Sequence, residues 1–400
     1  MNILKHTSLR SGSAVAILVA AALSGCGGGG GGGGSDGAVY FNASGVIANL
    51  ADNVIVPTYQ ELDGKTADMQ TAVAALDGDD LTDDELAQAQ DAWKATRRPW
   101  EAAEGFLFGP VDSLGIDPKL DTWPLDTATL ASTIGSGSGY NANASTDVQG
   151  FHTAEYLLFG DGTSSNDRTT DLSANERAYL TALLADFRTQ TQKLVQAWTS
   201  QYVPGDTGTG PYADELKLQG DGIYSSQLAV MEELINGMIG IVDEVGNGKI
   251  ADPFGTSIAT ADTTLVESQY SWNSLTDFYN NIQSVLNLYT GKRGYDPAVD
   301  SISTSLNGVY AFVNAHDAAL ADRVLDEIVA AMEAIALIDG DSDATTTDID
   351  DPMSQMPFRN AIKDAAGRIR IQAAIDALAT LQDSLEQDVQ PLIARTNFGG

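Results

Sequence analysis

The stretch TDDELAQAQDAWKATRRPWEAAE, residues 82–104, decides the class of fold. Thr82 stands three positions before Glu85, which is the pattern of a capping box at the start of a helix. Further along, Trp93, Arg97 and Trp100 recur at helical spacing and share one face. The stretch therefore predicts a long helix that runs to about residue 104.

The same signals extend over the rest of the chain. SANE, residues 173–176, is a second capping box that opens a helix to about residue 202. Runs of alternating β-branched residues are few, and no convincing strand pair is found. Further helices are predicted at 44–76, 147–158, 221–246, 262–290, 297–338 with a break near His316, and 355–394. The chain is therefore predicted to be all-α.

The helices fall into two sets of about four, separated by the loop PGDTGTGPYAD, residues 204–214. The simplest architecture is two packed halves that each resemble a four-helix bundle. We assign residues 44–203 to an N-terminal helical bundle and residues 213–395 to a C-terminal one. The order of elements alone suggests an internal duplication, because no sequence repeat has a fixed period.

The N-terminus has the form of a bacterial lipoprotein signal. Lys5 and Arg10 precede a short apolar run that ends in Leu-Ser-Gly-Cys at Cys26, the single cysteine of the chain. Residues 1–25 are predicted to be removed, which leaves Cys26 lipidated and residues 26–43 as a glycine-rich tether. The protein would then be anchored by lipid in the cell envelope, at the outer membrane, facing the periplasm or the cell surface. A plain secretory signal is the alternative.

The strongly acidic composition limits the partners. The chain carries 55 acidic and 21 basic side chains, a formal net charge of -34. Nucleic acids and anionic lipid surfaces would be repelled, so no nucleic-acid partner is expected. Metal cations and positively charged ligands are better candidates. Adaptation to salt or simple solubility would also account for the charge.

Charged residues on an apolar helical face mark a candidate pocket. On the helix predicted to begin after Thr82, Arg97 and Glu104 share a stripe with Trp93 and Trp100. Charges on such a face are costly unless they are paired or bind something. Pro99 lies inside this helix and predicts a kink at the same place. A buried Arg-Glu pair that only fixes helix packing is the alternative.

A second pair of polar residues lies in GFHTAEYLLFG, residues 150–160. His152 and Glu155 are one helical turn apart and project together, as metal-binding pairs do in helical bundles. Their neighbours are apolar, so the pair is expected to face Arg97 and Glu104. The aromatic loop 105–126, which contains Trp123, is expected to fold over the same region. A His-Glu hydrogen bond inside a core is the alternative.

These motifs together resemble the imelysin family, also called peptidase M75 or iron-regulated protein A. The resemblance is carried by W-x-x-x-R-x-x-W-E-x-x-E-x-F-x-F-G-P at residues 93–110, by Trp123-Pro124 and by G-x-H-x-x-E at residues 150–155. The stretches 221–250 and 267–291 also fit, and the similarity covers residues 45–394. It implies an all-helical envelope protein linked to iron uptake, with the GxHxxE site in a pocket where two halves meet.

The C-terminal half would supply the opposite wall of this pocket. On the helix predicted at 262–290, a stripe mixes a carboxylate and hydroxyl groups with aromatic rings. Its members are Glu267, Tyr270, Ser271, Ser274 and Phe278. Such a stripe is too polar for an ordinary core, and a surface position is the alternative. We therefore add Trp100, Trp123, Glu267 and Ser271 to Arg97 as candidate pocket residues.

Three functions remain open. The first is a metal-binding protein of iron uptake, with His152, Glu155 and Glu104 as ligands, which would act with an iron-bearing ligand and with envelope iron-transport partners. Mostly oxygen ligands favour iron, manganese or calcium, and zinc stays possible. The second is a metallopeptidase, although no HExxH is present. The third is a metal-free module in which Arg97 and His152 hold an anionic or peptide ligand.

One acidic segment needs separate treatment. DGDSDATTTDID, residues 339–350, places Asp at several ligand positions of a calcium loop. Ala344 stands where that loop requires Gly, and Asp350 replaces the bidentate Glu. We interpret the segment as a solvated loop between helices, with weak calcium binding as the alternative.

Overall fold

The computed structural model describes residues 40–76, 81–163, 171–202, 210–218, 222–296, 300, 306–340 and 356–399. Ala38–Gly400 forms one compact unit. The predicted signal peptide 1–25, the lipidated Cys26 and most of the tether 26–43 lie outside the described residues. Most of the loop 204–214 and of the segment 339–350 lies outside them too.

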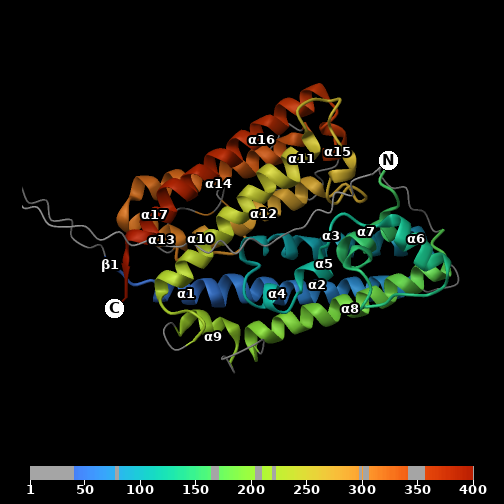
Figure 1. Cartoon of the computed structure of the whole chain (residues 1–400), viewed down its shortest axis with the longest axis horizontal. Coiled ribbons are helices and arrows are strands. Elements are labelled where there is room, and N and C mark those ends of the chain that lie inside the picture. The colour runs from blue at the N-terminus through green and yellow to red at the C-terminus, as the bar shows by residue number, and fades with distance from the viewer. Residues whose placement is uncertain are drawn as a thin grey trace, which may run out of the picture. The chain divides into compact units, whose positions relative to one another are not determined.

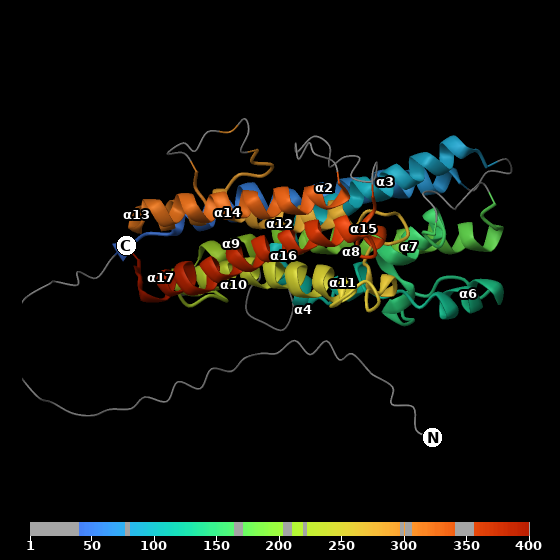
Figure 2. The ribbon, with the colours of Figure 1, turned by 90° about the horizontal axis from the view of Figure 1, so that it is seen from above.

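The first long helices pack around α2, as Figures 1 and 2 show. The helix α2 (Val56–Ala75) continues directly from α1 (Ser44–Asn49) and the π-helical segment η1 (Leu50–Ile55), and it packs on both α3 (Asp83–Glu101) and α8 (Ala174–Thr199). The capping boxes at Thr82 and Ser173 are both confirmed. Shorter elements follow α3: η2 (Glu104–Phe106), α4 (Pro110–Ser113), α5 (Asp117–Leu120), α6 (Thr127–Gly135), η3 (Thr146–Val148) and α7 (Gly150–Phe159).

In the later part of the chain, four helices pack in a ring. They are α10 (Gln227–Asp243), α12 (Ser274–Thr290), α14 (Ala318–Ala336) and α16 (Ala365–Ser384). The remaining elements are α9 (Tyr212–Lys217), η4 (Glu244–Ala251), α11 (Asp252–Phe254), η5 (Thr263–Leu265), α13 (Val309–His316), η6 (Leu337–Asp339), α15 (Phe358–Ala361), η8 (Leu385–Val389) and α17 (Gln390–Arg395). The predicted break near His316 is confirmed, because Asp317 caps α14.

The all-α fold class is confirmed. Helices from both parts of the chain pack as bundles that touch each other, since α12 contacts α3 and α10 contacts η2. Nearly every residue of α12 is buried, including polar ones. This central helix therefore brings polar groups into the interior of the fold. The boundaries of the two halves and the internal duplication stay predictions.

Three expectations about elements are wrong. The helix α3 ends at Glu101, two residues after Pro99, so that Glu104 lies in the separate turn η2. The helix expected at 262–290 begins only at Ser274, and residues 266–273 form a loop. Two short strands, β1 (Tyr40–Phe41) and β2 (Asn397–Phe398), pair in parallel although no strand pair was expected.

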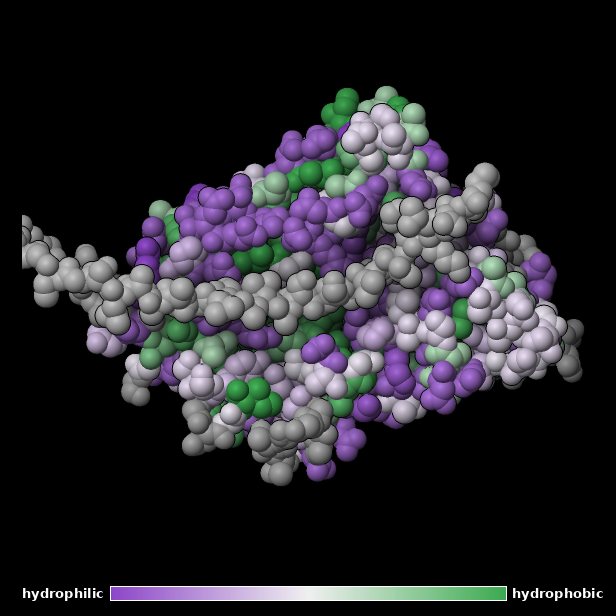
Figure 3. All heavy atoms as spheres, in the orientation of Figure 1, coloured by the Kyte–Doolittle hydropathy of each residue, from purple (hydrophilic) through white to green (hydrophobic). Residues whose placement is uncertain are grey.

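The described surface is polar over much of its area. Figure 3 shows hydrophilic side chains gathered over α14 and α16 on the face seen in Figure 1. None of the helices in the described part of the chain is both long enough and apolar enough to cross a membrane.

Candidate metal centre

The centre of the site is Arg97, whose side chain is fully buried on α3. Its Nη2 atom lies 2.6 Å from Glu101 Oε1 and 2.7 Å from Glu267 Oε1. Its Nε atom lies 3.1 Å from Asp277 Oδ2, and Nη1 pairs with Asp121. Burial lowers the pKa of Arg97, but these carboxylates raise it more, so the guanidinium stays charged.

Asp121 follows α5 and is fixed by two donors. Trp100 Nε1 donates to Asp121 Oδ2 at 2.7 Å, and Arg97 donates to Oδ1. Burial alone would raise the pKa of Asp121, but Arg97 and then His152 outweigh it, and the pKa lies well below its usual range. Asp121 is therefore a carboxylate anion with a fixed orientation.

A glycine brings α7 against the end of α5. Gly150 has a φ of +70°, and a Cβ atom there would lie 2.3 Å from the carbonyl oxygen of Leu120. Only glycine fits this close approach. Trp93 Nε1 also holds the helix by donating to Phe151 O at 3.0 Å. The Gly of the GxHxxE motif thus places His152 beside Asp121.

Glu155 orients His152. The Oε2 atom of Glu155 lies 2.9 Å from His152 Nδ1. Its Oε1 atom accepts three hydrogen bonds, from Tyr270 N at 3.0 Å, from Ser271 N at 2.8 Å and from Ser271 Oγ at 2.8 Å. Both oxygens of Glu155 therefore have donors, and the carboxylate fixes the ring and its tautomer.

The loop 266–273 supplies those donors and has an unusual backbone. Ser268 and Trp272 have φ values of 52° and 61°, which residues other than glycine rarely adopt. The strain is held by hydrogen bonds: Ser268 Oγ donates to Asp277, and Trp272 Nε1 donates to Gly162 O at 2.9 Å. Backbone strain of this kind is typical of functional sites.

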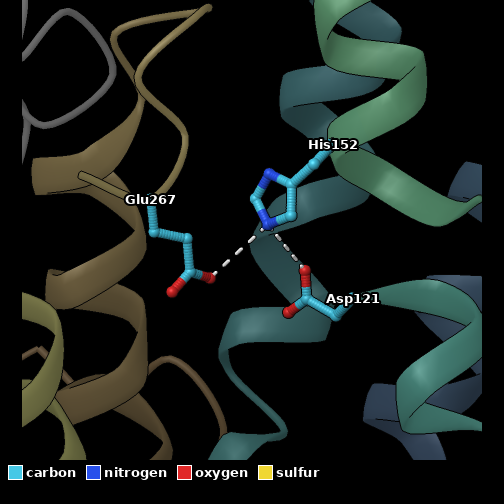
Figure 4. Close-up of side chains that lie close together, drawn as sticks. All are labelled: Asp121, His152 and Glu267. Atoms are coloured by element: carbon cyan, nitrogen blue, oxygen red, sulfur yellow. Dashed lines mark ion pairs between the residues drawn. The ribbon is translucent and has the colours of Figure 1, made fainter. Parts of the chain in front are cut away.

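Figure 4 shows how Asp121, His152 and Glu267 converge. His152 is fully buried, and its Nε2 atom lies 3.2 Å from Asp121 Oδ1 and 3.7 Å from Glu267 Oε1. Within the described residues, Nε2 makes no aligned hydrogen bond. One ligand atom of each residue lies within 4.8 Å of the others, as a metal site requires.

The surroundings of His152 fit a cation at Nε2, because Nδ1 already faces the Glu155 carboxylate at 2.9 Å. With the Nδ1 proton directed at Glu155, a neutral ring turns the Nε2 lone pair toward two carboxylate oxygens. Like partial charges repel, so a proton or a metal ion is needed between them. Burial lowers the pKa of His152, but Asp121, Glu155 and Glu267 raise it well above the usual value. A metal ion would replace the Nε2 proton.

A second group of carboxyls lies next to the first. Ligand atoms of Glu101, Glu104 and Asp121 lie within 4.8 Å of one another. Lys249 Nζ approaches Glu267 Oε1 at 3.4 Å, Glu101 Oε2 at 3.5 Å and Glu104 Oε1 at 3.9 Å. Burial raises the pKa of Glu101 to about 8 and that of Glu104 well above its usual value.

The pKa of Glu267 shifts in the opposite direction to those of Glu101 and Glu104. Burial would raise its pKa, but Lys249 and then His152 lower it more, to about 2. Glu267 is therefore ionised at neutral pH and presents a negative charge to the Nε2 atom of His152.

Trp123 lies against the imidazole. Its ring centroid is 4.7 Å from that of His152 and 5.9 Å from that of Tyr270. The aromatic loop expected over the pocket thus contacts the histidine, and Trp123 itself is half-buried.

The structure brings together most of the residues that the sequence singled out. Arg97, Trp100, Trp123, His152, Glu155, Glu267 and Ser271 all take part in the contacts described above. Glu104 lies further from His152 because α3 ends before it, and it contacts the site through Lys249. The ligand set His152, Glu155 and Glu104 remains a prediction, although the geometry places Asp121 and Glu267 closer to Nε2.

Sequence reasoning missed Glu101, Asp121, Lys249 and Asp277. One signal was available, since Glu101 follows Arg97 by four positions on the same helix. Asp121 stands two residues before Trp123, within the aromatic loop expected over the pocket. Lys249 and Asp277 carry no local signal, because only tertiary packing brings them to Arg97.

Comparison with known proteins shows which chains this one is similar to. An iron-regulated protein A from Synechococcus elongatus is 26% identical over 349 residues, which cover 87% of this chain and 86% of that protein. The crystal structure of an iron-regulated protein A precursor from Parabacteroides distasonis matches with a TM-score of 0.74 at 30% identity, covering 90% of this chain and 97% of that chain.

The fold also matches an imelysin-like protein from Psychrobacter arcticum. That structure is 16% identical, with a TM-score of 0.66 over 89% of this chain and 98% of the other. Residues 55–385 match the family model described as imelysin, peptidase M75. Because this match spans most of the sequence, the chain belongs to the imelysin family.

Proposed function

We propose that this protein binds a metal cation through Asp121, His152 and Glu267 and acts in iron uptake at the bacterial cell envelope. The observation that carries the proposal is the Nε2 atom of His152, which is buried beside two carboxylate oxygens and has no aligned hydrogen bond to any residue that the structure describes. Burying such an arrangement is costly unless a cation completes it.

The charge balance of the site supports a cation. Arg97, Lys249 and His152 are the basic groups that contact the acidic ones, and the acidic groups are more numerous. They are Glu101, Glu104, Asp121, Glu155, Glu267 and Asp277. Buried anions in excess stabilise a bound cation or take up protons, and the raised pKa values of Glu101 and Glu104, caused first by burial, are in accord with proton uptake.

The donor types favour iron. One imidazole nitrogen and several carboxylate oxygens suit ferrous or ferric iron and manganese, while zinc and calcium can also use such ligands. Two relatives carry the name iron-regulated protein A, which is consistent with iron. In this arrangement Glu155 fixes the imidazole through Nδ1, and Arg97 holds Asp121 in place.

The test is a metal titration of three proteins. Wild type should bind Fe²⁺ without oxygen, or Mn²⁺, and its melting temperature should rise with metal. His152→Ala should lose this binding. His316→Ala is the matched control, because His316 lies on α13 and contacts Phe312 O, outside the site. Equal binding by wild type and His152→Ala would exclude the site.

A second variant tests the role of Glu155. Glu155→Gln keeps the size of the side chain but replaces the anionic carboxylate, which accepts the hydrogen bond from His152 Nδ1, with a neutral amide. We expect metal affinity to fall about 10- to 100-fold while the helical circular dichroism signal persists. Elemental analysis and a peptidase assay on the same samples separate metal binding from the peptidase alternative. Peptide hydrolysis that disappears with His152→Ala would favour that alternative.

We further propose a lipid anchor at Cys26, which supports the envelope location. The short apolar run before a single cysteine is the pattern of a lipoprotein signal. Cys26→Ala should stop incorporation of labelled fatty acid and release the protein from membranes or leave it unprocessed, because the thioether forms only at that sulfur. Equal labelling of the variant would contradict the anchor.

A further inference from the structure

A pocket of about 460 Å³ lies beside the metal centre. Its walls come from η2, α4, α10 and η4, four elements that are distant in sequence. The lining residues are Glu104, Leu107, Phe108, Gly109, Asp112, Glu233, Asn236, Gly237, Gly240, Ile241 and Glu244.

The charges in this lining have one sign. Glu104, Asp112, Glu233 and Glu244 are acidic, and no Lys or Arg lines the pocket among the described residues. The pKa of Glu233 is raised by burial and then by Asp112, in accord with their closeness. A pocket lined by a single sign of charge attracts ions of the opposite sign.

Glu104 gives an independent indication of a ligand. Its side chain is 6% exposed, and it lines the pocket. Lys249 Nζ, at 3.9 Å, is the cation it approaches, and no hydrogen bond to its carboxylate is found within the described part of the chain. A carboxyl group buried to this degree normally has a donor. The side that faces the pocket is where a ligand would provide one.

The pocket also connects with the buried centre. Ligand atoms of Glu104, Glu101 and Asp121 lie within 4.8 Å of one another, and Asp121 belongs to the metal centre as well. In space, carboxyl groups therefore lead from Glu233 and Glu244 in the pocket through Glu104 to Asp121. Such a series suits a hydrated cation, because its water ligands can be replaced by carboxylates one after another.

The size of the pocket favours a hydrated metal ion over a bare one. Six waters at about 30 Å³ each occupy about 180 Å³, which the pocket accommodates. Carboxylates around such an ion accept hydrogen bonds from its waters, and one of them, Glu104, can replace a water before the ion moves inward.

We propose that the acidic pocket bounded by η2, α4, α10 and η4 is an outer site that binds a hydrated divalent metal ion and delivers it through Glu104 to the buried centre. The delivery step depends on the proposed function of that centre, but binding at the outer site does not.

The first experiment tests the outer site alone. Co²⁺ is titrated by calorimetry into His152→Ala, in which the buried centre is disabled. We expect a residual class of binding that disappears when Asp112→Asn, Glu233→Gln and Glu244→Gln are added. The control adds Asp68→Asn, Asp91→Asn and Asp326→Asn, three exposed residues outside the pocket with the same loss of charge.

Two results would overturn the outer site. One is residual binding that is equal in the pocket variant and the charge-matched control, or that is missing from His152→Ala. The other is displacement of Co²⁺ by equimolar spermidine, which would assign the pocket to organic cations. Neither result depends on whether His152 binds metal in wild type, so failure of the outer site is distinguishable from failure of the proposed function.

The second experiment tests delivery by blocking the pocket. Gly240 lies in α10, and a Cβ atom added there would meet nothing within 4 Å, so Gly240→Leu fills open space and Gly240→Ala is its small control. Stopped-flow quenching of tryptophan fluorescence by Co²⁺ reports loading, because Trp123 contacts His152. We expect Gly240→Leu to slow loading at least about tenfold with equilibrium affinity unchanged. Equal rates for Leu and Ala would exclude this route.

Discussion

At the scale of single residues, Glu101 shows how burial and pairing compete. Its side chain is fully buried on α3, where it contacts Arg97 and receives a hydrogen bond from Asn281 Nδ2. Burial dominates over the attraction of Arg97 and Lys249, and raises the pKa of Glu101 to about 8. In the metal-free protein this carboxyl therefore takes up a proton on folding.

This uptake predicts a pH dependence of stability. Between pH 4.5 and 8 the folded chain holds a proton at Glu101 that the unfolded chain releases, so the group lowers stability as pH rises. The side-chain amide of the Glu101→Gln variant is neutral at every pH, so the variant does not lose stability through this group as pH rises. With metal removed by chelator, the free energy of unfolding of Glu101→Gln relative to wild type should increase with pH, by up to about 1.4 kcal/mol per unit.

Urea unfolding at pH 5, 6.5 and 8 measures this difference. Glu232→Gln, at an exposed position on α10, is the control for loss of one carboxylate. A constant difference between Glu101→Gln and wild type over that range would show that Glu101 is ionised throughout.

Part of the site was predictable at this scale. Trp93, Arg97 and Trp100 repeat at helical spacing, and His152 and Glu155 stand one turn apart, so local geometry alone identifies them. The orientation of Glu155 was not predictable. Its oxygens face His152 Nδ1 and the loop amides of Tyr270 and Ser271 because of contacts between distant segments.

At the scale of elements, the contact of α10 with η2 positions Glu104. A Cβ atom at Gly237 would lie 2.2 Å from Gly105 O, whereas at Gly240, one turn later, it would meet nothing within 4 Å. The amide of Gly105 is also held, since it donates to Ser284 Oγ of α12 at 2.9 Å. The backbone of η2 therefore cannot easily retreat from α10.

The two glycines give a matched pair of substitutions. Gly237→Ala should destabilise the protein by about 1–3 kcal/mol, because α10 and η2 must separate. Gly240→Ala should stabilise it by about 0.5–1 kcal/mol, because alanine favours helix and space is free. Chemical unfolding of both variants measures these changes. Equal effects of the two substitutions would show that the packing of η2 on α10 is loose.

Elements were predicted well where sequence signals are local. Capping residues identify the starts of α3 and α8, and Asp317 explains the break before α14. The loop 266–273 was missed because its residues continue a helical stripe. Its positive φ values at Ser268 and Trp272 are stabilised by Asp277 and Gly162, which the local sequence does not reveal.

At the scale of the whole molecule, charge acts in two environments. Inside, Arg97 pairs with Asp121 and Lys249 pairs with Glu267 in a site that excludes water, where salt has little effect. Outside, basic residues are few, and pairs such as Lys217 with Asp52 are partly exposed and contribute little. With a formal net charge of -34, repulsion between surface carboxylates therefore opposes the compact state.

This balance predicts that added salt stabilises the protein. The Debye length shortens from about 30 Å at 0.01 M to about 8 Å at 0.15 M, which screens repulsion across the surface and leaves the buried pairs intact. The melting temperature of the metal-free protein should rise by about 1–3 °C over that range. Sodium chloride and tetramethylammonium chloride should act alike, since screening depends on ionic strength alone. A rise with sodium only would indicate ion binding, and a fall would show that exposed ion pairs stabilise the fold more than surface repulsion opposes it.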